Sequence, residues 1–401
     1  MIFMESTLPS LRRIQIQYTL IQMLYWAAYG AIAAFQTTLL LGRGFSSGDV
    51  GFFIALRCVA GIVVQWVGGW ADRHPKAPLK YILTVCLLLA LGVTAVLYTT
   101  RPGVLGTAVL LFLLGALELN AAPLLNSLAM QFINVGVDLN YSLSRGLGSL
   151  AYAVVCVFLG RISASAGVER VLPINMAGIA VLIVAILLFP VAPVLERTFG
   201  GERAQPHSVG YILKHNPPFT LMLVALFFVM APLISVQNFM HNIVIDLGGN
   251  EAHLGVALFL MGAAELPSAA VFPKLWRKFG AQTLMVLTML FMLLKVVGMS
   301  IPVLGVVLAV QLLQMLGYGL FLPTSLYYVN QNVPLVDQVR GQAIMMLASS
   351  SLCGVIGNLV SGFLIDLGGI RMLMAFCIGI GTVGMLVALL ALRWAKKRGA
   401  F

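Results

Sequence analysis

Five charged residues lie deep inside long apolar stretches of the sequence: Arg57, Glu118, Arg145, Glu265 and Lys295. If those stretches cross a bilayer, each ionised group costs about 2.5–3.5 kcal/mol near the centre and needs a partner or water. A carboxylate there is subject to two opposed influences, because burial favours its neutral form and a neighbouring cation favours its charged form. Such a group is suited to taking up and releasing a proton as its surroundings change.

Each acid has a functional and a structural interpretation. Glu265 is predicted to carry a proton or to accept a hydrogen bond from a solute; the alternative is a fixed ion pair with Arg145 or Lys295. Pro267 predicts a kink in the helix near Glu265. For Glu118 the alternatives are a proton carrier and a counter-charge to Arg57 or Arg145.

The cations leave similar alternatives open. Lys295 is predicted either to bind a solute or to serve as a structural counter-charge. Three cations against two acids leave one net positive charge, which favours an anion bound by Arg57 or Arg145 if all five groups share one cavity.

Two predicted helices carry stripes of polar and aromatic residues spaced three, four or seven apart, which places each stripe on one helical face. The first stripe contains Gln15, Tyr18, Gln22, Tyr25, Tyr29 and Gln36, and the second contains Gln311, Gln314, Tyr318, Ser325, Tyr328 and Asn332. A third helix adds Gln237, Asn238 and His241. The stripes predict a water-filled cavity with solute-binding groups; the alternative is polar pairing across dry helix interfaces.

The elements that position these residues are membrane helices. The 401 residues are 60% hydrophobic and 9% charged, whereas soluble proteins carry about 25% charged residues. The apolar stretches have the length of spans, about 20 residues each. They are predicted at 14–41, 48–70, 80–100, 103–132, 140–163, 171–195, 217–246, 252–273, 281–301, 303–332, 341–365 and 370–394.

The net charge of +11 follows the asymmetry of the predicted loops and does not indicate nucleic-acid binding. Most Lys and Arg residues fall in alternate loops and at both ends of the chain, so both termini are predicted to be cytoplasmic, in a bacterial inner membrane. All five cysteines lie within spans. The sequence predicts no cofactor, no metal site and no enzymatic constellation.

The longest polar stretch divides the chain into two halves of six predicted spans. Residues 1–196 are the first six-helix bundle, 197–216 a cytoplasmic linker and 217–401 the second bundle. Short basic turns at corresponding positions, Gly68–Lys80 and Phe272–Leu284, support an internal repeat. Repeated halves are typical of secondary transporters, with the solute site near the midplane between them.

The residues Gly68, Ala71, Asp72, Arg73 and Lys76 resemble the signature loop of the major facilitator superfamily, although Pro75 stands where that signature has a glycine. Within the superfamily the chain resembles the branch of lactose permease and related proton symporters. This resemblance rests on GAAELPSAAVF (Gly262–Phe272) and SRGLGSLAYA (Ser144–Ala153).

The resemblance implies a twelve-helix major facilitator fold, with Glu265 as the essential carboxylate and Arg145 as a sugar-binding arginine. It also implies a conformational latch at Asp72 and Arg73. The chain departs from the pattern elsewhere: Asn126 replaces a sugar-binding carboxylate, Lys295 replaces an arginine, and Gln314 and Gly317 replace a histidine and a glutamate. These departures weaken the case for galactosides and leave room for uniport.

We therefore expect a monomeric transporter working by alternating access, most simply a symporter of protons with a sugar, nucleoside or small organic acid. The solute is expected to bind between the first, fourth, seventh and tenth spans. The alternatives are a facilitative uniporter, a proton-driven exporter of apolar drugs, whose cavity would be richer in Phe and Met, and a non-transporting membrane receptor or scaffold.

Overall fold

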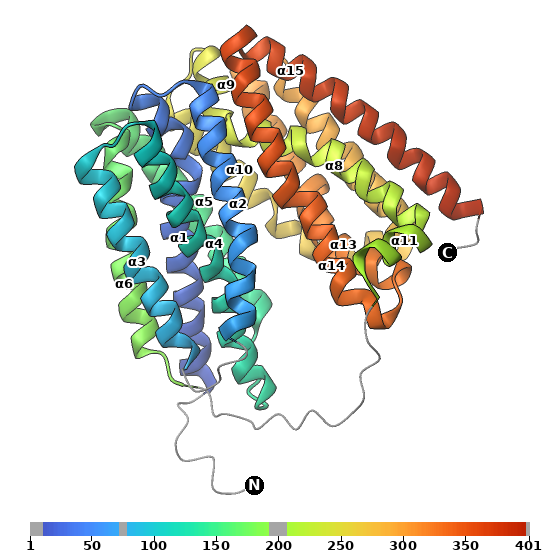
Figure 1. Ribbon diagram of the computed structural model, residues 1–401, viewed down its shortest axis with the longest axis horizontal. Helices are drawn as coiled ribbons and strands as arrows, with labels where there is room; N and C mark the ends of the chain where they lie inside the picture. Colours follow the sequence, from blue (N-terminus) through green and yellow to red (C-terminus); the bar gives the residue numbers. More distant parts are fainter. Residues whose placement is uncertain (1–10, 72–77, 192–206, 398–401) are drawn as a thin grey trace, which may run out of the picture. The chain divides into compact units, whose positions relative to one another are not determined.

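The computed structural model describes residues 11–71, 78–191 and 207–397, and this part of the chain consists of helices and connecting turns without a strand. The predicted all-helical class is confirmed (Figure 1). The predicted latch residues, Asp72 and Arg73, and the linker residues 197–206 lie outside the described residues.

The chain forms two compact units. Unit 1 comprises Met1–Leu39 and Leu56–Phe199, and unit 2 comprises Leu40–Ala55 and Gly200–Phe401. Thus the end of the first helix and the start of the second are grouped with unit 2. The division into halves at 1–196 and 217–401 does not predict this grouping of Leu40–Ala55 with unit 2.

Long helices build unit 1. They are α1 (Leu11–Gly42), α2 (Ser47–Ala71), α3 (Leu79–Thr100), α4 (Val104–Asn134), α5 (Tyr141–Ala166) and α6 (Val171–Leu188), with a short 3₁₀ turn η1 (Val168–Arg170) before α6. The first helices are stabilised from within by apolar residues such as Ile21, Phe35 and Leu114, which are almost completely buried.

Unit 2 contains more interrupted helices. They are α7 (Val209–His215), α8 (Pro217–Asn238), α9 (Met240–Asp246), α10 (Glu251–Ala264), α11 (Leu266–Met299), α12 (Leu304–Ala309), η2 (Val310–Gln314), η3 (Met315–Gly319), α13 (Leu320–Asn332), η4 (Leu335–Asp337), α14 (Gln338–Met346), η5 (Leu347–Ser351) and α15 (Leu352–Lys397). Two of these helices contain a sharp internal break, at Gly280 in α11 and Gly369 in α15, where φ is +70°. The breaks fall next to the starts of the predicted spans at 281 and 370.

The predicted span 303–332 is not a uniform α-helix. It begins as α12, tightens into the 3₁₀ segment η2, widens into the π-helical segment η3 and continues as α13. Pro323 lies four residues after Gly319, so its ring displaces the carbonyl group at the end of η3 and favours the wide turn there. The register of the polar stripe therefore changes between Gln314 and Ser325.

In the described part of the chain, nine helical segments are long and apolar enough to cross a membrane. One of them, Leu335–Lys397, is 63 residues long and includes the break at Gly369, so it covers two of the predicted spans. The described helices overlap every predicted range.

A close helix crossing in unit 1 positions one of the buried charges. A Cβ atom added at Gly115 of α4 would lie 2.6 Å from Cγ of Arg57 and 3.0 Å from its Cα and carbonyl oxygen. Glycine is therefore needed for α4 to approach α2 at the point where the Arg57 side chain leaves the helix.

We predict that Gly115→Ala lowers the free energy of unfolding by about 1–3 kcal/mol, because the added methyl group overpacks the crossing. Gly92→Ala is the matched control, because Gly92 lies in helix α3 and a Cβ there meets nothing within 4 Å. It should be neutral or stabilise by up to about 1 kcal/mol. Thermal denaturation in detergent measures both; equal stability of the two variants would contradict the packing argument.

Candidate functional site

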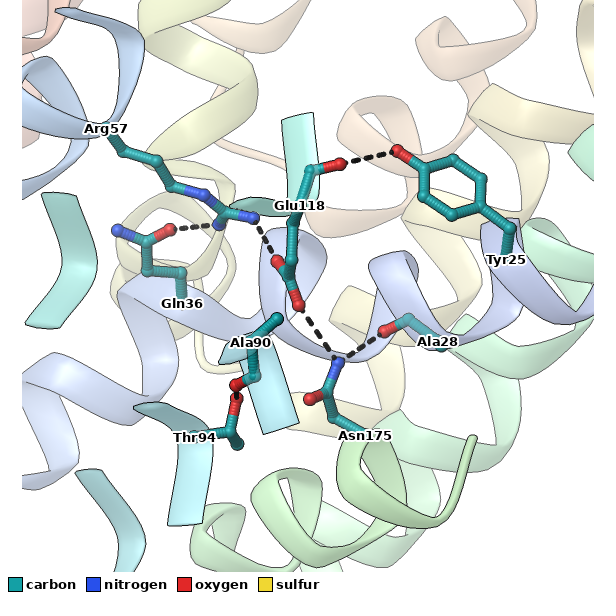
Figure 2. Close-up of polar contacts among 8 residues, drawn as sticks. All are labelled: Tyr25, Ala28, Gln36, Arg57, Ala90, Thr94, Glu118 and Asn175. Atoms are coloured by element: carbon teal, nitrogen blue, oxygen red, sulfur yellow. Dashed lines mark hydrogen bonds and ion pairs between the residues drawn. The ribbon is translucent and has the colours of Figure 1, made fainter. Parts of the chain in front are cut away.

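A buried ion pair joins α2 and α4 in unit 1. Nη2 of Arg57 donates to Oε2 of Glu118 at 2.8 Å, and Nη1 donates to Oε1 of Gln36 on α1 at 2.6 Å (Figure 2). Arg57 is 5% exposed and Glu118 is 3% exposed. The two opposite charges thus neutralise each other inside a single unit.

Further hydrogen bonds fix Glu118 in place. Nδ2 of Asn175 on α6 lies 3.4 Å from Oε1 of Glu118 and also donates to the carbonyl oxygen of Ala28 at 2.8 Å. The Tyr25 hydroxyl donates to the backbone oxygen of Glu118 at 3.0 Å, as Figure 2 shows. Four helices therefore converge on this pair. The arrangement favours the counter-charge interpretation of Glu118 over that of a proton carrier, and it leaves Arg57 little surface for a solute.

Arg145 has a different environment. Its guanidinium group lies 3.9 Å from the ring centroid of Trp26, in a cation–π contact, and Nη1 donates to Oγ of Ser149 at 2.7 Å. The side chain is half-buried. A guanidinium group has five N–H donors, so Arg145 can contact the indole ring and still donate to further acceptors.

The neighbours of Arg145 include several predicted binding residues. Nε1 of Trp26 donates to Oε1 of Gln22 at 3.1 Å, and Nε2 of Gln22 lies 3.5 Å from Oδ1 of Asn126. The rings of Tyr25, Trp26 and Tyr29 pack together with centroids 5.2–6.0 Å apart. The structure therefore brings Gln22, Tyr25, Tyr29 and Asn126 close to one another in unit 1.

Most of the first polar stripe is hydrogen-bonded within unit 1. Tyr18, Gln22, Tyr25 and Gln36 are at most 4% exposed. Tyr18 donates to the carbonyl oxygen of Leu125 on α4 at 3.2 Å, and Gln22 donates to the Tyr18 hydroxyl. For these residues the geometry agrees with the second interpretation of the stripe, pairing between helices.

Unit 2 contains an amide bridge between an acid and a base. Oε1 of Gln314 accepts from Nζ of Lys295 at 2.7 Å and from Nε2 of Gln237 at 3.2 Å. Nε2 of Gln314 donates to Oε1 of Glu265 at 2.9 Å. The amide of Gln314 thus accepts from Lys295 on one side and donates to Glu265 on the other.

The two ends of this bridge differ in accessibility. Lys295 is 1% exposed, whereas Glu265 is half-buried. Glu265 occupies the junction between α10 and α11, with Pro267 at the start of α11, so the predicted kink is present. Pro267 has no N–H to donate, so one hydrogen bond of the helical ladder is missing beside the carboxylate.

The remaining predicted residues of unit 2 lie on α8, α9 and η3. Nδ2 of Asn238 donates to Oδ1 of Asn358 at 2.8 Å. Nδ1 of His241 is buried and has no hydrogen-bond partner among the described residues. Tyr318 is half-buried and packs against Phe321, with ring centroids 6.1 Å apart.

Sequence reasoning missed two residues of the unit 1 site, Trp26 and Asn175. Trp26 lies one helical turn after Gln22, so its spacing could have marked it beside the stripe. Asn175 is a lone amide in the otherwise apolar sequence of α6, which is the signal that could have found it. Among the described residues, no group of three or more His, Cys, Asp or Glu could hold a metal ion.

Long apolar helices with polar clusters buried between them are typical of a multi-pass membrane protein. The sequence model of the MFS_1 like family matches residues 15–376, so the chain belongs to that family. The maltose permease of Geobacillus stearothermophilus is 24% identical over 390 residues, which are 95% of each chain. The uncharacterized transporter YwbF of Bacillus subtilis (strain 168) is 21% identical over 340 residues, 80% of this chain and 82% of YwbF.

Solved structures show the same fold. The nucleoside transporter NupG matches with a TM-score of 0.80 at 12% identity, covering 94% of this chain and 98% of NupG. A bacterial homologue of the human lysosomal transporter Spinster, inward-facing and occupied, matches with a TM-score of 0.70 at 14% identity, covering 96% and 98%. These similar proteins are membrane transporters, not enzymes, and the predicted membership of the major facilitator superfamily is confirmed.

We predict that Glu118→Gln destabilises unit 1 by about 3–5 kcal/mol, because it leaves the Arg57 charge buried without its partner. The double variant Arg57→Gln/Glu118→Gln should recover part of the loss, since it removes both charges. Glu169→Gln is the control: its pair with Arg101 is partly exposed and spans 4.0 Å, and it should cost less than about 1 kcal/mol. Thermal denaturation in detergent measures all three, and equal small effects of Glu118→Gln and Glu169→Gln would contradict this account.

Proposed function

We propose that the protein is a secondary active transporter that couples proton movement to the symport of a small polar solute across a bacterial inner membrane. In this proposal twelve membrane helices form two six-helix halves, both termini are cytoplasmic, and the monomer works by alternating access. The amide bridge from Lys295 through Gln314 to Glu265 is the single observation that carries the coupling proposal.

Glu265 is the proposed proton carrier because its surroundings support two charge states. Nε2 of Gln314 donates to its carboxylate at 2.9 Å, and the side chain is half-buried at a helix break. When Glu265 takes up a proton, Gln314 can keep its bond to Lys295 and release the acid. Glu118 differs because it forms an ion pair with Arg57. We therefore propose that Glu118 supports the cycle by neutralising Arg57.

We propose a set of solute-binding groups in each unit, polar and aromatic in character. In unit 1 these are Arg145, Trp26, Tyr29 and Asn126, which are half-buried. In unit 2 they are Gln237, Asn238, His241 and Tyr318, which are also half-buried. Amides and aromatic rings suit hydroxyl-rich solutes, so sugars or nucleosides are the first candidates; the names of the maltose permease and of NupG are consistent with both.

The two arginines of unit 1, Arg57 and Arg145, also allow a small organic acid as the solute. Glu118 neutralises Arg57, whereas the contacts described for Arg145 are to Trp26 and Ser149. An acidic solute would therefore be recognised by Arg145 in preference to Arg57.

Facilitative uniport is the second candidate. It is favoured by Gln314, because an amide at this position transmits a hydrogen bond but carries no titratable proton. Uniport requires no change of charge at Glu265. The two candidates therefore differ in what removing that charge does to accumulation.

A thermal-shift screen of sugars, nucleosides and carboxylates on the purified protein should first identify the solute. In proteoliposomes, Glu265→Gln should then lose accumulation driven by a pH gradient while keeping solute counterflow, because exchange does not need net proton movement. Asp246→Asn, which changes an exposed acid of α9, is the matched control and should keep both activities. Accumulation by Glu265→Gln at the wild-type level would rule out coupling through this residue, and the same facilitated flux with or without a gradient in the wild type would establish uniport.

A further inference from the structure

The start of α2 is attached to α15 by a carboxylate. Oδ1 of Asp366 accepts from the backbone N–H of Ser47 at 3.0 Å, and Oδ2 accepts from the N–H of Gly48 at 2.7 Å. Backbone N–H groups in the first turn of a helix lack partners within that helix, and the helix dipole favours a negative charge there. Asp366 thus supplies both the acceptors and the charge.

A local N-cap satisfies other N–H groups of this turn and leaves the N–H groups of Ser47 and Gly48 for Asp366. Oγ of Ser46 accepts from the N–H of Asp49 at 3.1 Å, while the Asp49 side chain accepts from the N–H of Ser46 at 3.1 Å. The N–H of Val50 donates to the carbonyl oxygen of Ser46 at 3.0 Å. The donors of the first turn are therefore divided between a cap from its own chain segment and a carboxylate from a distant helix.

The two helices also touch through their backbones. A Cβ atom at Gly51 would lie 2.3 Å from the carbonyl oxygen of Asn358, and a Cβ atom at Gly362 would lie 2.3 Å from the carbonyl oxygen of Ser47. Ser47 and Gly51 are one turn apart on α2, and Asn358, Gly362 and Asp366 are successive turns of α15. The contact is a continuous seam in which glycine on each helix permits the close approach.

Amides from α8 and α9 brace this seam. Nδ2 of Asn242 donates to Oγ of Ser47 at 3.2 Å, and Nδ2 of Asn238 donates to Oδ1 of Asn358 at 2.8 Å. These contacts join residues of the segment Leu40–Ala55 to other helices of unit 2, with which that segment is grouped.

We propose that Asp366 is a positioning residue of the transport cycle, whose carboxylate holds the first turn of α2 on unit 2 and whose release is a step that sets the turnover rate. This inference rests on the proposed function. The segment Leu40–Ala55 is the part of α1 and α2 that belongs to a different unit from the remainder of those helices. A step that frees this segment must break the two contacts to Asp366, while the local cap by Ser46 and Asp49 keeps the helix end intact.

Hydrogen–deuterium exchange and solute counterflow test this proposal on the full chain. Asp366→Asn keeps the size of the side chain but removes its charge, so exchange of the amides at 47–51 should rise about tenfold, which corresponds to ~1.4 kcal/mol. Turnover at saturating solute should change at least about threefold, with solute affinity unchanged, and Asp366→Glu should restore turnover in part.

Two further variants make the test specific. Asp49→Asn weakens the local cap alone and should leave turnover at the wild-type value. Gly362→Ala keeps the Asp366 charge but forces the seam apart, so it should reproduce the effects of Asp366→Asn even if that variant folds poorly.

Unchanged exchange in both Asp366→Asn and Gly362→Ala would overturn the contact itself. Faster exchange with unchanged turnover would overturn the role in the cycle. The exchange measurement needs no solute, so an absence of transport in the wild type would contradict the proposed function while leaving the Asp366 contact separately tested.

Discussion

The requirement that a buried charge have a partner governs the construction of unit 1. Removing Arg57 and Glu118 from water costs several kcal/mol for each ion, and only a close, hydrogen-bonded pair recovers that cost. Nη2 of Arg57 lies 2.8 Å from Oε2 of Glu118. Three further residues have roles that depend on this pair: Gln36, Asn175 and Gly115. The amides satisfy remaining hydrogen-bonding groups, and the glycine lets the two helices approach closely enough.

In unit 2 a side-chain amide lies between the buried basic group and the acid. Its buried cation, Lys295, meets an amide, and the amide meets the half-buried acid Glu265. A neutral amide tolerates either protonation state of the acid more readily than a guanidinium in direct contact does, because less charge attraction is lost. Unit 1 thus pairs its buried charges directly, whereas in unit 2 an amide lies between the buried lysine and the half-buried acid.

Much of the helical architecture follows from sequence, because long apolar runs in a bilayer must form helices. The kink at Glu265 is likewise predictable from Pro267. The choice of partner for Glu118 is not, since two arginines were available and only packing decides between them. The wide turn η3 shifts the register of the second stripe in a way that periodicity alone does not reveal. The contact of Asp366 with Ser47 joins residues far apart in sequence and depends on the seam between α2 and α15.

The central claim is that Glu265 exchanges the coupled proton while the pair of Arg57 and Glu118 stays fixed. Proton uptake on solute binding tests this claim most directly, measured as the pH change when solute is added to the purified protein in weak buffer. The wild type should take up about one proton per solute at a pH where Glu265 is charged, and Glu265→Gln should take up none. Equal uptake by the two proteins would contradict it.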